Sequence, residues 1–130
     1  MQVNRHRRPL ILVVEDVEET RHGIELLLAD GYQVLSAGDE AEAVLQARLA
    51  SPDLILMSLG VDTLEQVAIA LRVRECAVLG DATPIVLFCI PTLDEGAEIE
   101  VAPNLYLTRP DNFDQLRRLF RRLLLVRQPC

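Results

Sequence analysis

The sequence predicts a single α/β domain in which helices cover both faces of a parallel β-sheet. Short apolar runs alternate along the chain with longer segments whose apolar residues recur at helical spacing. This alternation is typical of parallel strands joined by crossover helices, which cover the sheet on both sides. A length of 130 residues suits one such domain with a sizeable core.

Five apolar runs are the expected strands. LILVV and DLILM are almost continuously apolar, as strands buried on both faces of a parallel sheet are. Pro52 separates DLILM from the preceding helical segment, and Ser58 stands where that strand would end. The five runs cover residues 10–14, 33–37, 53–57, 84–89 and 105–108.

Apolar residues at helical spacing predict the intervening helices. The last helix has the clearest pattern, with apolar side chains at steps of three and one from Phe113 to Leu124. Asp111 is the expected N-terminal cap of that helix. A weak fourth helix is expected within residues 92–101. The other helices are expected around residues 17–28, 41–49 and 64–76.

Five strands alternating with five helices limit the topology, because crossovers between parallel strands are right-handed. We expect a three-layer, flavodoxin-like (βα)5 fold, which is a doubly wound parallel sheet with strand order 2-1-3-4-5. In such sheets the functional site lies beyond the carboxyl ends of the strands. The residues at those ends are Glu15, Asp16, Ser58, Cys89 and Arg109.

Composition and charge narrow the classes of function. Half of the residues are hydrophobic and a quarter are charged, which is ordinary for a globular protein. The net charge of −7 argues against nucleic-acid binding. No apolar run approaches the roughly 18 residues that span a bilayer, and no apolar signal segment follows the basic start. We therefore expect a cytoplasmic protein with neither nucleic-acid nor membrane partners.

The two ends of the chain are expected to lie outside the domain. Residues 1–8 are interpreted as a flexible N-terminal arm, residues 9–127 as the domain and residues 128–130 as a tail. Three scattered cysteines are too few for a disulfide framework or a zinc site, so reduced thiols are expected.

Four segments carry a resemblance to a known family. They are ILVVEDVEETR, with an acidic pair after the first strand, SPDLILMSL at the third strand, TPIVLFC at the fourth, and YLTRP at the fifth. Each segment alone is a weak signal. In this order and spacing, over residues 9–127, they resemble the receiver domain of two-component response regulators, the CheY-like family.

The resemblance implies a phosphoryl-transfer site. Receivers accept a phosphoryl group from a histidine kinase on an aspartate at the end of the third strand, where this aspartate and the acidic pair hold Mg²⁺. The metal and a lysine after the fifth strand neutralise charge on the phosphoryl oxygens. A Ser or Thr after the fourth strand hydrogen-bonds the attached group, and an aromatic residue on the fifth strand then changes its packing.

This chain keeps only part of that set. Glu15 and Asp16 match the acidic pair, and the carbonyl of Gly60 falls at the main-chain metal ligand. Ser58 replaces the phosphoacceptor aspartate. The other positions hold Cys89 in place of the Ser or Thr, Arg109 in place of the lysine, and Tyr106 at the aromatic switch position.

Ser58 is expected to end a strand without accepting a phosphoryl group. A neutral hydroxyl is a poor acceptor unless a base activates it. The replacement also removes a metal ligand and a charge, so we expect that no cofactor is required and that Mg²⁺ binding is weak. Asp53 lies at the opposite end of the strand and Asp62 lies in a loop, so neither acid is expected to substitute.

The acidic pair fits two roles, an ion pair with Arg109 or weak Mg²⁺ binding. Arg109 is not equivalent to lysine, because its guanidinium is larger and planar. All 13 basic residues are arginine, so this change alone says little about lost activity. Tyr106 is expected to be a half-buried strand residue that does not switch, because no phosphoryl group would drive it.

These features predict an atypical receiver domain that is not an enzyme. It would act in two-component phosphorelay signal transduction by binding a protein partner (a kinase, a regulator or an output protein) independently of phosphorylation. The rival hypothesis is a residual Mg²⁺-dependent phosphoryl acceptor that uses Ser58 or a nearby acid.

The charge distribution suggests where a partner would bind. Residues 94–100 hold four acidic side chains and no basic one, whereas the last helix is rich in arginine. In receivers, the fourth helix, fifth strand and fifth helix form the usual contact face. Opposed patches on this face suit a homodimer, and internal ion pairs are the alternative. The arginines concerned are Arg117, Arg118, Arg121 and Arg122.

Overall fold

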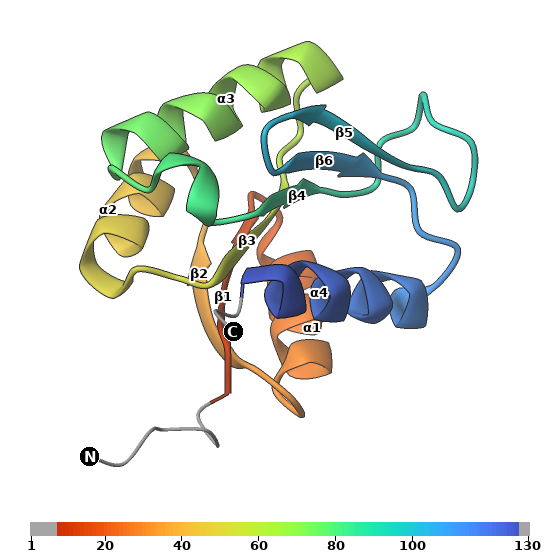
Figure 1. Ribbon diagram of the computed structural model, residues 1–130, viewed down its shortest axis with the longest axis horizontal. Coiled ribbons are helices and arrows are strands. Elements are labelled where there is room, and N and C mark those ends of the chain that lie inside the picture. The colour runs from red at the N-terminus through yellow and green to blue at the C-terminus, as the bar shows by residue number, and fades with distance from the viewer. Residues whose placement is uncertain (1–7, 128–130) are drawn as a thin grey trace.

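A six-stranded β-sheet runs through the centre of the computed structural model, which describes residues 8–127 (Figure 1). The strand order is β2-β1-β3-β4-β6-β5. Neighbouring strands are parallel except β5, which is antiparallel to β6. The strands are β1 (Leu10–Glu15), β2 (Gln33–Ala37), β3 (Leu54–Ser58), β4 (Ile85–Leu87), β5 (Glu98–Ala102) and β6 (Leu105–Thr108).

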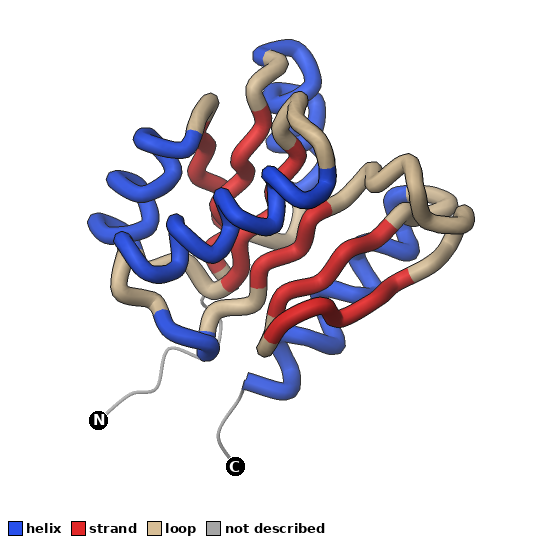
Figure 2. The backbone as a smooth tube through the Cα atoms, turned by 90° about the horizontal axis from the view of Figure 1, so that it is seen from above, coloured by secondary structure: helices blue, strands red, loops and turns tan. Residues whose placement is uncertain are grey.

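Two helices cover each face of the sheet, which confirms the three-layer α/β architecture (Figure 2). α1 (Glu18–Leu28) and α4 (Phe113–Arg127) cover one face, and α2 (Glu40–Ala50) and α3 (Thr63–Cys76) cover the other. A short 3-10 helix, η1 (Gly80–Ala82), precedes β4. Within residues 8–127, no helix is long and apolar enough to cross a membrane.

Each face of the sheet buries its own hydrophobic cluster, because successive side chains of a strand point to opposite sides. In β1, Leu12 and Val14 join the cluster under α2 and α3, while Ile11 and Val13 join the cluster under α1 and α4. The continuous apolar runs in the sequence are therefore explained by strands that are buried on both faces.

Side chains at the starts of α3 and α4 accept hydrogen bonds from the first turn. Asp62 caps α3, with its Oδ1 2.8 Å from the backbone nitrogen of Glu65. At α4 the predicted cap, Asp111, is wrong by one residue. The Oδ1 of Asn112 instead accepts from the backbone nitrogen of Gln115 at 2.9 Å.

The ends of the chain are only partly described. Residues 1–7 of the expected arm and the expected tail, residues 128–130, lie outside the described residues. Arg8 is described and makes two hydrogen bonds. Its guanidinium donates to the carbonyl of Ala29 at 3.0 Å, and its own carbonyl accepts from the Gln33 side chain at 2.9 Å.

The prediction of a fourth helix within residues 92–101 is wrong. That segment forms a loop followed by β5, which pairs with β6 and becomes the edge of the sheet (Figure 2). The (βα)5 pattern therefore has four α-helices in the described chain. The predicted order 2-1-3-4-5 is correct for the parallel strands, with β6 in the fifth place, and is extended by an antiparallel edge strand.

Local sequence explains why this segment is a hairpin. Ile99 and Val101 alternate with two glutamates, which is the period of a strand. Gly96 has φ +86, which disfavours helix continuation, and Asn104 has φ +58 in the turn before β6. The turn residues Pro103 and Asn104 join two antiparallel strands directly, so no crossover helix is needed.

Arg74 links α3 to the turn of this hairpin. Its side chain is 6% exposed. Its guanidinium donates to the carbonyls of Pro103 at 2.7 Å, Asn104 at 3.0 Å and Thr83 at 3.3 Å. A buried arginine with three carbonyl acceptors fixes the hairpin on α3 and the start of β4.

Candidate functional site

The carboxyl ends of β1 and β3 bring Glu15 and Ser58 side by side. The two residues are register partners in the parallel β1–β3 pair. Cys89 follows β4, whose extension is held to β3 by a hydrogen bond from the nitrogen of Phe88 to the carbonyl of Met57 at 3.2 Å. The sheet therefore gathers the predicted positions that follow β1, β3 and β4 at one edge, as a doubly wound fold does.

Glu15 is a buried carboxylate at this edge, with 5% of its side chain exposed. Its Oε2 accepts a hydrogen bond from the nitrogen of Val17 at 3.1 Å. Burial, and to a smaller extent neighbouring Asp16, raise the pKa of Glu15, although the Val17 hydrogen bond opposes the shift. The guanidinium of Arg21 donates to the main-chain carbonyl of Glu15 at 2.8 Å.

Asp16 is exposed and is held by Gly60. The nitrogen of Gly60 donates to the Oδ2 of Asp16 at 3.0 Å. A Cβ atom at position 60 would lie 2.9 Å from the same oxygen, so a side chain there would displace the Asp16 carboxylate. The structure thus brings the acidic pair and Gly60 together. The contact is made by the N–H of Gly60, whereas the expected metal ligand was the carbonyl of that residue.

Ser58 provides a neutral hydroxyl where receivers carry the acceptor. The side chain is partly buried, and within residues 8–127 it makes no hydrogen bond. Asp53 lies at the other end of β3 and accepts from the nitrogen of Leu10 at 2.7 Å, while Asp62 caps α3. Neither Asp53 nor Asp62 therefore lies at the strand end beside Glu15.

Cys89, at the position where the sequence resemblance implies a Ser or Thr, has a left-handed backbone conformation with φ +61. Desolvation, and then the nearby charge of Glu15, raise the pKa of the Cys89 thiol. The thiol therefore stays protonated at neutral pH, and a thiol is a weaker hydrogen-bond donor than the hydroxyl it replaces.

Arg109 is bonded to the loop that precedes β5. Its guanidinium donates to the carbonyl of Leu93 at 3.0 Å, and its backbone bonds to Gly96 and Ala97 in the loop before β5. Among the described residues it forms no ion pair with Glu15 or Asp16. The ion-pair interpretation of the acidic pair is therefore wrong, because the loop that replaces the fourth helix takes up this arginine.

Tyr106, at the aromatic switch position, is half-buried on β6 and packs against the cluster under α1 and α4. Its hydroxyl donates to the Oδ1 of Asn104 at 3.2 Å. Burial, and then the charge of Glu100, raise the pKa of Tyr106. The side chain is thus tied to the turn that Arg74 holds.

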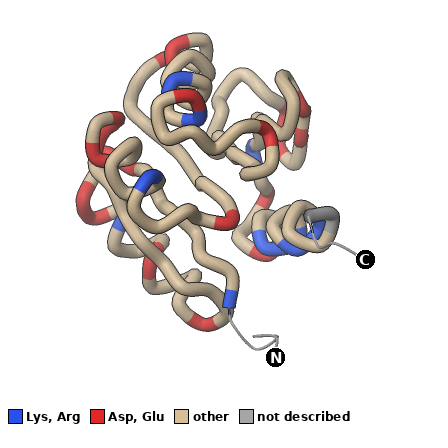
Figure 3. The backbone as a smooth tube through the Cα atoms, turned by 60° about the vertical axis from the view of Figure 1, so that its left-hand side comes forward, with Lys and Arg blue, Asp and Glu red and all other residues tan. Residues whose placement is uncertain are grey.

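The four arginines of the predicted contact face separate onto two sides of α4. Arg122 donates to the Oε1 of Glu98 at 2.6 Å, and Arg118 lines the same shallow groove. Arg117 and Arg121 lie on the other side, beside α1. Figure 3 shows these basic positions along the helix that ends near the C-terminus. The predicted contact face is therefore partly closed by an internal ion pair.

Sequence reasoning missed two residues that shape the site. Gln66 is buried, and its Oε1 accepts from the nitrogen of Leu59 at 3.0 Å, which holds the loop after β3. Arg21 holds the end of β1 through the carbonyl of Glu15. Both contacts join residues from different elements, and no local pattern in the sequence marks them.

The residues at the edge fit Mg²⁺ poorly. The two carboxylates already accept backbone hydrogen bonds, and burial favours the neutral form of Glu15. No group of three or more His, Cys, Asp and Glu side chains that could hold a metal occurs in the part of the chain that the structure describes. A hard cation generally needs more charged oxygen ligands than this.

Comparison with curated proteins finds relatives in two-component signalling. The transcriptional regulatory protein KdpE of Staphylococcus aureus is 28% identical over 120 residues, which is 85% of this chain and 48% of that protein. The hybrid signal transduction histidine kinase D of Dictyostelium discoideum is 42% identical over 55 residues, which is 42% of this chain and 4% of the kinase. The chain spans less than half the length of either relative. No family model matches the sequence.

Solved receiver structures share the fold over most of the chain. The response regulator TrrA from Thermotoga maritima, in complex with Mg²⁺ and BeF, has a TM-score of 0.65 at 22% identity, covering 88% of this chain and 98% of that one. The chemotaxis protein CheY4 of Vibrio cholerae has a TM-score of 0.64 at 21% identity, covering 89% and 98%. The receiver domain of the hybrid histidine kinase CckA has a TM-score of 0.60 at 24% identity, covering 88% and 98%. The chain thus has the flavodoxin-like fold of response regulator receiver domains and is similar to them over most of its length.

Proposed function

We propose that this chain is an atypical receiver domain that acts in two-component signalling by binding a protein partner, without phosphorylation of an aspartate. The observation that carries the proposal is the β1–β3 register, in which Glu15 stands opposite Ser58. A receiver places its acceptor carboxylate at this strand end. Here the position holds a neutral hydroxyl, and Asp53 and Asp62 are engaged elsewhere.

Three further positions support independence from phosphorylation. Cys89 offers a weak donor to a phosphoryl oxygen. The guanidinium of Arg109 is bonded to the carbonyl of Leu93 and would have to leave it to reach the site. The hydroxyl of Tyr106 donates a hydrogen bond to Asn104, which holds the ring in place. A switch residue would have to break this bond in order to move. The proposed domain requires no cofactor and is not an enzyme.

The proposed partner is a kinase, a regulator or an output protein in the cytoplasm. Its contact surface is the hairpin of β5 and β6 together with α4, where Arg118 is exposed beside the acidic segment. The same surface supports a homodimer by charge complementarity, although Glu98 and Arg122 already pair internally. Sedimentation velocity at low and high salt tests the dimer, which should dissociate as screening increases.

Intact-mass measurement tests independence from phosphorylation. The protein is incubated with Mg²⁺ and acetyl phosphate and then weighed by mass spectrometry. We expect no gain of a phosphoryl group, and partner binding should be equal before and after the incubation. A stoichiometric gain of one phosphoryl group would falsify the proposal.

A second candidate function is a residual Mg²⁺-dependent phosphoryl acceptor that uses Ser58 or a nearby acid. The closeness of Ser58, Glu15 and Asp16 favours it. If phosphorylation occurred, Ser58→Ala would abolish the mass gain for a serine acceptor and leave it intact for an acidic one.

Ser58→Asp should increase Mg²⁺ affinity. A carboxylate at position 58 would join Glu15 and Asp16 at the strand ends, and each added charged oxygen strengthens the binding of a hard cation. We expect calorimetric titration to show a gain of about tenfold or more, equivalent to roughly 1.4 kcal/mol. Ser58→Asn, which has a similar shape without charge, is the control. Equal affinities for the two variants would show that the strand ends do not converge on a metal position.

A further inference from the structure

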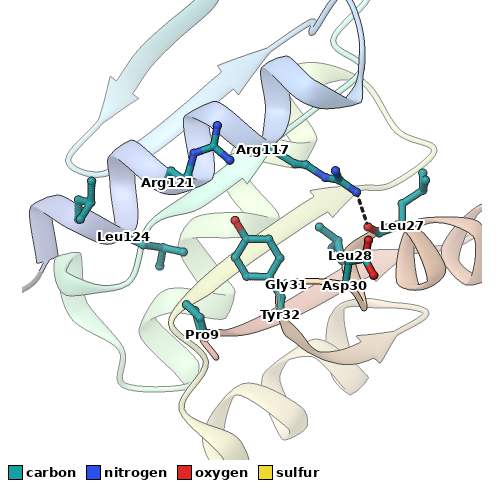
Figure 4. Close-up of a pocket in the computed structure, with 10 residues that line it drawn as sticks. Pro9, Leu27, Leu28, Asp30, Gly31, Tyr32, Arg117, Arg121 and Leu124 are labelled. Atoms are coloured by element: carbon teal, nitrogen blue, oxygen red, sulfur yellow. Dashed lines mark hydrogen bonds between the residues drawn. The ribbon is translucent and has the colours of Figure 1, made fainter. Parts of the chain in front are cut away.

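A groove between α1 and α4 lies at the amino end of β1, at the opposite end of the sheet from Ser58 (Figure 4). Its volume is about 700 Å³. Most of its wall is apolar, which is typical of sites for small organic ligands. The apolar lining residues are Pro9, Leu27, Leu28, Leu124 and Leu125.

Tyr32 and Arg121 each place a polar group at the wall of this groove. Within residues 8–127, neither the Tyr32 hydroxyl nor the Arg121 guanidinium makes a hydrogen bond or an ion pair. In Figure 4 the hydroxyl of Tyr32 points toward α4, the helix that carries Arg121. By contrast, Arg117 donates to the carbonyl of Leu27 at 2.8 Å and stacks 5.0 Å from the centre of the Phe113 ring.

Tyr32 is fixed in position before any ligand binds. Its ring meets Phe120 edge-on, with 6.0 Å between centroids and an interplanar angle of 81°. Burial raises the pKa of the Tyr32 hydroxyl, against the opposing charges of Arg121 and Arg117. The hydroxyl therefore stays protonated and can donate a hydrogen bond, beside the Arg121 guanidinium, which can only donate.

The apolar wall, the Tyr32 hydroxyl and the Arg121 guanidinium are together complementary to a ligand with an apolar body and an anionic hydrogen-bond acceptor. We propose that the groove binds a small amphipathic anion, such as an aromatic or alkyl carboxylate or sulfonate. Its apolar part lies on the leucine wall, and its anionic group accepts from Tyr32 and Arg121. Asp30 lines the end near Leu27 and Arg117, so it directs the anion toward the Tyr32 end. This site is independent of the proposed function at Ser58.

Anilinonaphthalene sulfonate is a suitable probe, because it joins aromatic rings to an anionic group and fluoresces when its rings leave water. We expect wild-type protein to bind one molecule. Arg121→Glu should weaken binding about tenfold or more, since it replaces a charge-assisted hydrogen bond with repulsion. Tyr32→Phe, which removes only the hydroxyl, should weaken binding about fivefold.

Arg118→Glu is the matched control, because it makes the same charge change on the same helix but lies outside the groove. It should change the affinity by less than about twofold, since an exposed charge at a distance is screened. Near-UV circular dichroism of every variant separates loss of the site from loss of the fold.

A second probe tests the role of the anionic group. N-phenylnaphthylamine has the same rings without the sulfonate, and its binding should not change in Arg121→Glu. Dodecanoate should displace anilinonaphthalene sulfonate, and acetate should not. Equal losses in Arg121→Glu and Arg118→Glu, or no saturable binding to the folded wild type, would overturn the proposal.

Discussion

The two halves of the sheet reach the carboxyl edge in different ways. In the first half, β1 and β3 are parallel neighbours followed by α1 and α3, and they place Glu15 opposite Ser58. In the second half, the chain from β4 to β6 runs through a loop and the antiparallel strand β5. The first half therefore follows the predicted alternation of strands and helices, whereas the second half has a hairpin where a helix was predicted.

This difference changes where the site residues of the second half point. Asp16 and Gly60, from the first half, remain in contact at the edge. Arg109 is instead bonded to the loop at Leu93, and Tyr106 is bonded to the turn at Asn104. The side chains at the ends of β1 and β3 therefore lie together, whereas Arg109 and Tyr106 are held by the loop and the turn of the hairpin.

Arg74→Ala should have the largest effect, because it removes the link between α3 and the hairpin. Three carbonyls would lose their donor, and we expect the free energy of unfolding to fall by about 3 kcal/mol. Urea denaturation followed by circular dichroism measures this change. Arg72→Ala is the control on the same helix, since its pair with Glu40 is exposed and should contribute much less to stability. Similar losses in both variants would contradict the role given to Arg74.

Two glycine substitutions in the first half should have opposite signs. Gly60→Ala places a Cβ atom 2.9 Å from the Oδ2 of Asp16, so we expect a loss of about 1 kcal/mol. Gly23→Ala, within α1, meets no atom within 4 Å and should stabilise the protein by about 0.5 to 1 kcal/mol. Thermal unfolding of the two variants checks the signs. A stabilising Gly60→Ala would show that Asp16 does not require the close approach.

Glu15 should give the smallest effect, a pH dependence of stability. Its raised pKa means that the folded state binds this proton more tightly than the unfolded state does. Stability should therefore fall as pH rises from about 4.5, the ordinary value, through the raised pKa of the folded protein. Glu15→Gln should remove this part of the pH dependence of the free energy of unfolding. Glu18→Gln, at an exposed position, should not change it. Chemical denaturation at a series of pH values distinguishes them, and an unchanged slope in Glu15→Gln would assign the effect elsewhere.

Local patterns predicted most of the first half. The apolar runs and helical spacings correctly indicated β1 to β3 and α1 to α3, and they placed Asp53 at the far end of its strand. The hairpin was missed because residues 98–102 are few and strongly acidic, although Ile99 and Val101 alternate as in a strand. The partners of Arg74 and Arg109 depend on which elements meet in space, and sequence spacing carries no signal for such contacts.

The antiparallel strand β5 also bears on aggregation. Within residues 8–127 no strand pairs with its outer edge, and alternate N–H and C=O groups of an edge strand are open to another chain. Ile99 and Val101 are exposed there and would favour stacking of copies. The irregular register between Glu100 and Ala102, the adjacent glutamates and Pro103 oppose such growth. Solubility of the protein should therefore depend on these few residues more than on its net charge.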